Sequence, residues 1–119
     1  MKDNKPNESS PKLLQITSSL VKKDFEMPMN SSFISEEDLV QALADRVFQL
    51  IEKNLEQLFS ILYRLDVNER KVHEALQGNN EIPANIEIAR LIVARQKEKA
   101  KTRMEYDSKE VDDEDATPW

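Results

Sequence analysis

The sequence predicts an all-α fold, a small bundle of three to four short helices with disordered N- and C-terminal tails. The first observation is a set of helix-start signatures: Ser35, Asn54 and Asp66 each precede an apolar-periodic stretch, with an acid or amide three residues later. An N-cap side chain accepts a hydrogen bond from an unpaired backbone N–H, and the third residue can reach back to the cap. The second observation is that Gly78 is the one glycine in 119 residues. Tight β-hairpin turns need positive φ, so hairpin-rich β folds are disfavoured.

Residues 1–33 are expected to form a flexible N-terminal tail, because prolines, serines and lysines are scattered through them with weak apolar periodicity. Within this segment, Ser10 can cap a short helix that starts at Pro11. Two interpretations stay open. In one, the segment is mostly unfolded with transient helicity; in the other, it is a docking segment that becomes ordered on a partner. The weak periodicity favours the first.

The first well-defined helix is expected over residues 35–53, where apolar residues recur at three- and four-residue steps. Ile34 before the cap and Leu39 after the first turn can form a hydrophobic staple. A second helix is expected over residues 54–65. The alternative is that the junction between these two segments is only a bend in one continuous helix.

Asp66 is expected to cap a third helix, which Gly78 ends as a left-handed terminator. After a loop at residues 79–83, a fourth helix is expected to start at Ala84 and to reach about Met104. The remaining residues are rich in Asp and Glu and are expected to form an acidic disordered tail. The chain is therefore divided into a flexible N-terminal tail, a helical domain and an acidic tail, at residues 1–33, 34–104 and 105–119.

Composition excludes several functional classes. The chain has no cysteine, so it has no disulfide frame, thiolate metal site or cysteine nucleophile. The polar N-terminus and the lack of a long apolar run predict neither a signal peptide nor a membrane span, which favours the cytoplasm. His73 is the one histidine, and its spacing from Glu69 differs from the Glu-x-x-His pattern of di-iron bundles. We therefore expect no metal, no cofactor and no enzymatic activity.

The apolar arcs of the second and fourth predicted helices are wider than a single core-facing stripe requires. In one interpretation the fourth helix is central and its neighbours bury the whole arc. In the other, part of the arc is an interface for a second subunit or a partner protein. The first is slightly favoured. If the second holds, the expected contact residues are Leu58, Ile61, Tyr63, Ile88 and Leu91.

The strongest electrostatic feature is a basic stretch that an acidic one follows directly. Its positive residues are Arg90, Arg95, Lys97, Lys99, Lys101 and Arg103. In a helix they would occupy two faces that can contact phosphates, with the acidic segment as a mask. More often such charge blocks are a solvated helix end. No aromatic residue interleaves with them, so bases have nothing to stack on, and the net charge of −6 also disfavours general nucleic-acid binding.

Three stretches together resemble a group of short uncharacterised bacterial all-helical proteins. They are LADRV, LFSILYRLDV and IARLIVARQ, at residues 43–47, 58–67 and 88–96. The resemblance covers about residues 36–100 and neither tail. The group has no established activity, so the resemblance implies a bacterial, cytoplasmic helical module and transfers no site residues.

These observations favour a small non-enzymatic protein-interaction or adaptor module that binds a protein partner or associates with itself. The alternative is an RNA- or ribosome-associated protein that binds phosphates through residues 90–103. Salt dependence separates the two, because phosphate contacts weaken steeply as salt rises, whereas an apolar interface responds much less.

Overall fold

The computed structural model describes residues 11–78 and 81–113, with side chains up to Glu105. These residues contain five helices and no strand, which confirms the all-α prediction and corrects the expected number of three to four helices. The helices are α1 (Pro11–Asp24), α2 (Glu36–Lys53), α3 (Leu55–Leu65), α4 (Glu69–Leu76) and α5 (Ala84–Asp113).

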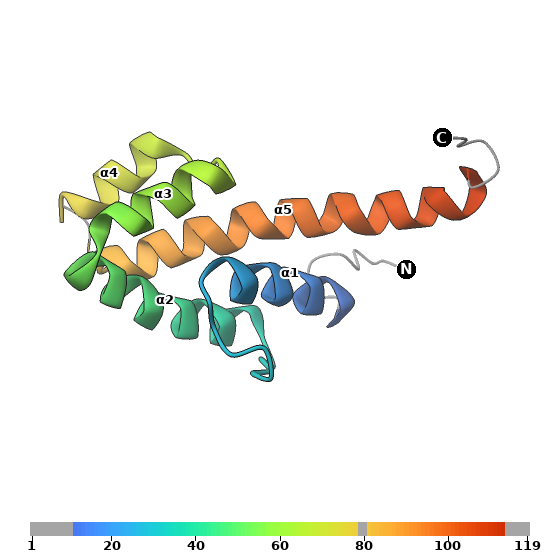
Figure 1. Cartoon of the computed structure of the whole chain (residues 1–119), viewed down its shortest axis with the longest axis horizontal. Helices are drawn as coiled ribbons and strands as arrows, with labels where there is room; N and C mark the ends of the chain where they lie inside the picture. The colour runs from blue at the N-terminus through green and yellow to red at the C-terminus, as the bar shows by residue number, and fades with distance from the viewer. Residues whose placement is uncertain (1–10, 79–80, 114–119) are drawn as a thin grey trace.

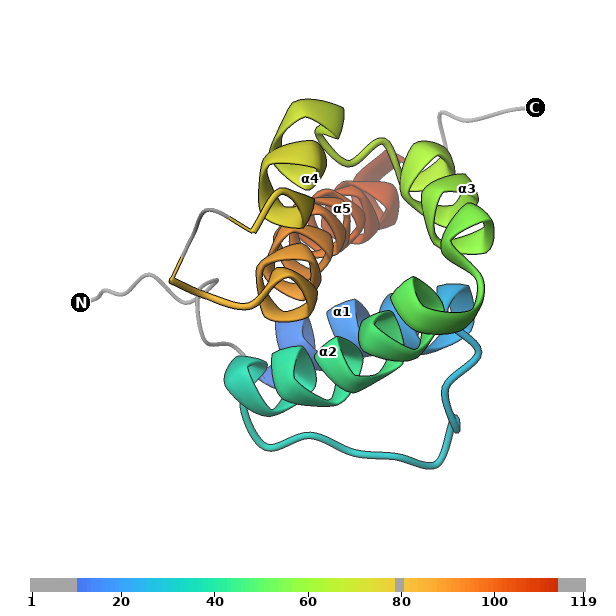
Figure 2. The same cartoon turned by 90° about the vertical axis from the view of Figure 1, so that its left-hand side faces the viewer.

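Helix α5 is the axis of the molecule, and each of the other four helices packs against it. Helices α1 and α2 lie on one side of α5, and α3 and α4 lie on the other (Figures 1 and 2). The far end of α5 extends beyond the other helices (Figure 1). The buried residues at its start include Ile88, Ala89, Ile92 and Val93. Most of the wide apolar arc of this helix is therefore core, because neighbours cover it from several directions, and Leu91 at its edge is half-buried.

Helix α1 is part of the fold, which corrects the expectation of a flexible tail over residues 11–33. The short helix that begins at Pro11 is present, and Leu13, Val21 and Phe25 are buried. Its apolar stripe looks weak in the sequence because polar side chains share the buried face: Thr17, Ser18 and Lys22. Residues 1–10 lie outside the described part of the chain.

The end of α1 is held by a backbone turn and by a side chain of α2. Glu26 adopts a positive φ of 55°, and the N–H of Met27 donates to the carbonyl of Lys22 at 2.9 Å. This six-to-one bond is typical of the Schellman motif, which usually has glycine at the left-handed position. Arg46 Nε donates to the carbonyl of Phe25 at 3.0 Å, which fastens the same turn to α2.

The predicted caps of α2 and α3 are confirmed. Ser35 Oγ accepts a hydrogen bond from the N–H of Asp38, and Asn54 Oδ1 accepts one from the N–H of Gln57, both at 3.1 Å. Helices α2 and α3 are therefore two separate helices, and the alternative of one bent helix is wrong. Gly78, with φ of 75°, follows the last turn of α4, as predicted for a left-handed terminator.

Two other predictions at helix starts are corrected. Ile34 is 92 % exposed whereas Leu39 is buried, so they form no hydrophobic staple. The cap of α4 is Asn68, whose Oδ1 accepts a hydrogen bond from the N–H of Lys71 at 3.1 Å. Asp66 instead closes α3 in the left-handed conformation, with φ of 64°. Aspartate enters this region more readily than most residues, because its short polar side chain can hydrogen-bond locally.

Helix α5 continues to Asp113, so the predicted acidic tail is helical over residues 105–113. Glu, Lys and Arg are good helix formers, and a high density of charge therefore does not end a helix. Residues 114–119 lie outside the described part of the chain. Among the helices described, none is both long enough and apolar enough to cross a membrane.

Candidate protein-interaction groove

A groove of about 650 Å³ lies between α3 and α4. Both helices pack on α5 but make few contacts with one another, so space remains between their facing sides. We call this space the α3–α4 groove. The residues that line it are Glu56, Phe59, Ser60, Leu62, Tyr63, Asp66, Val67, Asn68, Glu69, Val72 and His73.

The floor of the groove is aliphatic and belongs to the core. Leu62, Val67 and Val72 line it and are buried. The turn after α3 sets this floor, because the N–H of Val67 donates to the carbonyl of Leu62 at 3.1 Å while Asp66 takes the left-handed conformation. That pattern is a second Schellman motif, and it directs the chain from α3 back towards α4 across α5.

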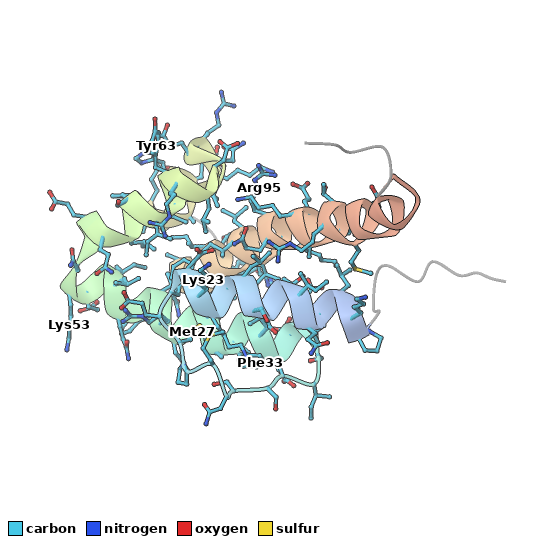
Figure 3. The ribbon with its side chains drawn as sticks, turned by 45° about the vertical axis from the view of Figure 1, so that its right-hand side comes forward. Lys23, Met27, Phe33, Lys53, Tyr63 and Arg95 are labelled. Atoms are coloured by element: carbon cyan, nitrogen blue, oxygen red, sulfur yellow. The ribbon has the colours of Figure 1, made fainter. Side chains whose placement is uncertain are left out.

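Aromatic side chains form the walls of the groove. Phe59 of α3 is half-buried, and its ring centroid lies 6.0 Å from that of His73 on α4, with 30° between the ring planes. Tyr63, one turn after Phe59, is 83 % exposed. Figure 3 shows Tyr63 on the opposite side of the molecule from Met27 and Phe33. The groove is therefore flanked by one largely exposed aromatic side chain, that of Tyr63, and by the half-buried ring of Phe59.

The rim of the groove is acidic. Glu56, Asp66 and Glu69 line it and are exposed, and no Lys or Arg is among the lining residues. Asp66 lies 3.5 Å from the guanidinium of Arg95. Glu56 and Glu69 form no ion pair with another described residue. Two carboxylates beside the apolar floor are therefore available to a partner.

The structure separates the five predicted interface residues. Leu58, Ile61 and Ile88 are buried in the core and Leu91 is half-buried, so these residues do not form the expected exposed patch. The reason is that α3 packs against both α2 and α5, which buries Leu58 and Ile61, and that α5 is covered by the other four helices, which buries Ile88. Only Tyr63 is exposed. Phe59 was not predicted, although it and Tyr63 share a helix face at four-residue spacing.

The basic stretch is partly used inside the fold. Arg95 Nε donates to the carbonyl of Leu65 at 3.2 Å, and its guanidinium lies 3.0 Å from Glu98. Lys97 pairs with Glu36 at 2.8 Å, which joins α5 to the first turn of α2. Arg95 and Lys97 therefore contribute to the packing of α5 against its neighbours. The others make no ion pair with a described residue: Arg90, Lys99, Lys101 and Arg103.

A second hollow of about 490 Å³ lies between α1 and the loop that follows it. Lys22 is buried beneath this loop, and its Nζ donates to the carbonyls of Met29 and Ser31 at 3.0 and 2.7 Å. Serine hydroxyls and apolar side chains share the lining, and they include Ser18 and Phe33. Lys22 thus holds a loop in place by two backbone contacts.

No family model matches the chain, and neither the curated proteins nor the solved structures contain a match to it. The resemblance of residues 36–100 to short bacterial helical proteins therefore stays a prediction. Within the described residues, no group of three or more His, Cys, Asp or Glu side chains is placed to hold a metal ion.

Proposed function

We propose that this protein is a small non-enzymatic interaction module whose α3–α4 groove receives a segment of another protein. The observation that supports this most is Tyr63, which is 83 % exposed beside a groove with a buried aliphatic floor. Tyrosine is enriched at the centres of protein interfaces because its ring is apolar and its hydroxyl can still meet water or a partner. Grooves between helices on small domains commonly receive amphipathic segments.

Burial of Tyr63 against a partner would supply part of the free energy that a specific contact needs. A buried aromatic side chain removes roughly 150 Å² from water, which is worth about 4 kcal/mol at the usual transfer coefficient. Losses of translational and side-chain freedom offset part of this gain. Phe59 is half-buried and adds some further apolar area, whereas Leu62, Val67 and Val72 are already buried and add little. Tyr63 is therefore the main apolar contact that the groove can offer a partner.

The same groove gives little support for catalysis. Ser60 and His73 both line it, but among the described residues no hydrogen bond joins the serine hydroxyl to the imidazole. An activated serine needs a base within hydrogen-bond reach and a further group that orients that base. The ring of His73 contacts Phe59 instead. We therefore include the absence of enzymatic activity in the proposal.

Photo-crosslinking from position 63 tests the proposal. A photoreactive phenylalanine analogue replaces Tyr63 in cells that express the protein, and the same analogue replaces Phe48 in a control. Phe48 is 52 % exposed but does not line the groove. We expect discrete protein adducts from position 63 and none of these from position 48. The same adducts from both positions, or none from position 63, would contradict the proposal.

The alternative function, phosphate binding through residues 90–103, is supported by the residues of that stretch that make no ion pair with a described residue. They are Arg90, Lys99, Lys101 and Arg103. If it holds, the triple substitution of Lys99, Lys101 and Arg103 by Ala weakens retention on immobilised RNA at low salt and flattens its salt dependence. Unchanged retention in this variant would remove the alternative.

A further inference from the structure

We infer that the segment taken up by the α3–α4 groove is a basic amphipathic helix of a partner protein. This inference rests on the proposed function and names the chemical class of the partner. Its groove-facing side would carry aliphatic or aromatic residues, and its flanks would carry Lys or Arg. Shape, surface chemistry and charge each support this class.

The shape of the groove favours a helix. Helices α3 and α4 both lie on α5 and leave an opening of about 650 Å³ between them. A third helix in this opening would bury apolar residues at i, i+3, i+4 and i+7 against both neighbours. An extended strand would need a sheet edge to pair with, and the described residues contain no strand. The anchors of such a helix would contact the exposed ring of Tyr63 and the half-buried ring of Phe59.

The charge of the groove favours basic flanks. Glu56 lies in the first turn of α3 and Glu69 lies in the first turn of α4, so their carboxylates stand on the two helices that bound the opening. No Lys or Arg lines the groove to neutralise them. Complementary charges at the rim of an interface speed association and reject partners of the wrong sign. The net charge of −6 attracts a basic segment over longer distances.

The same charges disfavour other occupants. A phosphate-bearing ligand would meet the carboxylates of Glu56, Asp66 and Glu69 without a compensating cation in the lining. An acidic segment would meet the same repulsion. The basic stretch of a second copy has the right sign, but the apolar residues of the same helix, among them Ile88, Ile92 and Val93, are buried in their own core and cannot enter the groove of another copy. A basic helix of another protein therefore fits the groove best.

Two matched model peptides test the inference on the full chain. Both are about 16 residues long with leucines at the same helical positions, and the remaining positions are Lys in one peptide and Glu in the other. Binding is measured by fluorescence anisotropy of the labelled peptides. We expect the lysine peptide to bind at least about tenfold more tightly than the glutamate peptide. Tyr63→Ser should weaken binding of the lysine peptide by a similar factor.

A pair of charge variants separates the groove from the overall negative charge. The variant Glu56→Gln/Glu69→Gln removes two rim carboxylates. The control Glu52→Gln/Glu74→Gln removes the same charge from exposed positions on α2 and α4 that do not line the groove. We expect the rim variant to bind the lysine peptide about threefold to tenfold more weakly than the unsubstituted protein does. The control should bind it less than about twofold more weakly.

Each remaining outcome has a defined meaning. Equal weakening by the rim and control variants would show a general charge effect and overturn the inference. If the glutamate peptide bound as tightly as the lysine peptide, and Tyr63→Ser weakened both, the partner class would be wrong but the groove would stand. If neither peptide bound, or if Tyr63→Ser had no effect on binding, both the inference and the proposed function of the groove would be wrong.

Discussion

The side-chain amide of Gln96 donates a hydrogen bond to the carboxylate of Asp24 at 2.7 Å, which joins the middle of α5 to the last turn of α1. Gln96 is 1 % exposed, so this bond lies inside the helix interface. The other oxygen of Asp24 lies 3.8 Å from the guanidinium of Arg64 on α3. One carboxylate therefore links three helices that are distant in sequence, and it fixes where α1 lies along α5.

Substitution Gln96→Glu should destabilise the protein strongly at pH 7, because two carboxylates would then face each other in a buried place. We expect a loss of about 2–4 kcal/mol in the free energy of unfolding, measured by urea denaturation with circular dichroism. The double variant Asp24→Asn/Gln96→Glu exchanges amide and carboxylate and should recover much of that loss. Equal stability of the single and double variants would show that this pair does not determine the packing of α1.

Substitution Phe25→Ala tests whether the segment after α1 belongs to the core. Phe25 is 1 % exposed and lies in the main apolar cluster, so the substitution leaves a cavity and should cost about 3–5 kcal/mol. Phe48→Ala is the matched control on α2, where the side chain is 52 % exposed, and it should cost less than about 1 kcal/mol. Similar midpoints for both variants in thermal unfolding would argue that residues 11–33 are not part of the fold.

Substitution Lys22→Met keeps the aliphatic stem but removes the ammonium that holds the carbonyls of Met29 and Ser31. We expect faster amide hydrogen exchange and faster proteolytic cleavage over residues 27–34. The free energy of unfolding should fall by about 1–3 kcal/mol, because the two carbonyls lose their hydrogen-bond donor. Lys23→Met is the control, because Lys23 is the adjacent residue and is exposed. If Lys22→Met left the hydrogen exchange and the cleavage of this loop unchanged, the role of the two contacts would be contradicted.

Two substitutions at left-handed positions should shift stability in opposite directions. A Cβ at Gly78 would meet no atom within 4 Å, so Gly78→Ala isolates the cost of its φ of 75° and should destabilise by about 1 kcal/mol. Glu26→Gly relieves the strain of a non-glycine residue at φ of 55° and should stabilise by about 0.5–1 kcal/mol. Urea midpoints measure both, and changes of the same sign would contradict the explanation by backbone conformation.

The starts of α2 and α3 could be predicted because a cap is a local interaction. Ser35 and Asn54 each bond to an N–H three residues later, which sequence spacing shows directly. Asp66 could not be assigned in this way, since aspartate suits both a helix start and a left-handed helix end. The N–H of Val67, which reaches back into α3, decides between these two roles. That bond depends on the direction the chain takes across α5.

The order of α1 and the position of the groove depend on contacts between distant segments. Lys22 can be buried because the carbonyls of Met29 and Ser31 accept its hydrogen bonds. The spacing of apolar residues along a helix does not indicate such contacts. The groove exists because α3 and α4 diverge on the surface of α5, so sequence spacing identified Tyr63 but not the opening beside it. Leu58 and Ile61 were candidates for an exposed interface, and they are buried. Sequence could not decide this, because an apolar stripe that two neighbours bury has the same width as one that is half exposed.

The central place of α5 has a consequence for biosynthesis. Translation produces α1 to α4 before α5, yet each of them packs its apolar side against that last helix. The nascent chain therefore carries uncovered leucine, valine and phenylalanine side chains until α5 has left the exit tunnel. Stable tertiary structure is expected to form late and in one cooperative step, and until then the emerging polypeptide is a natural client for chaperones.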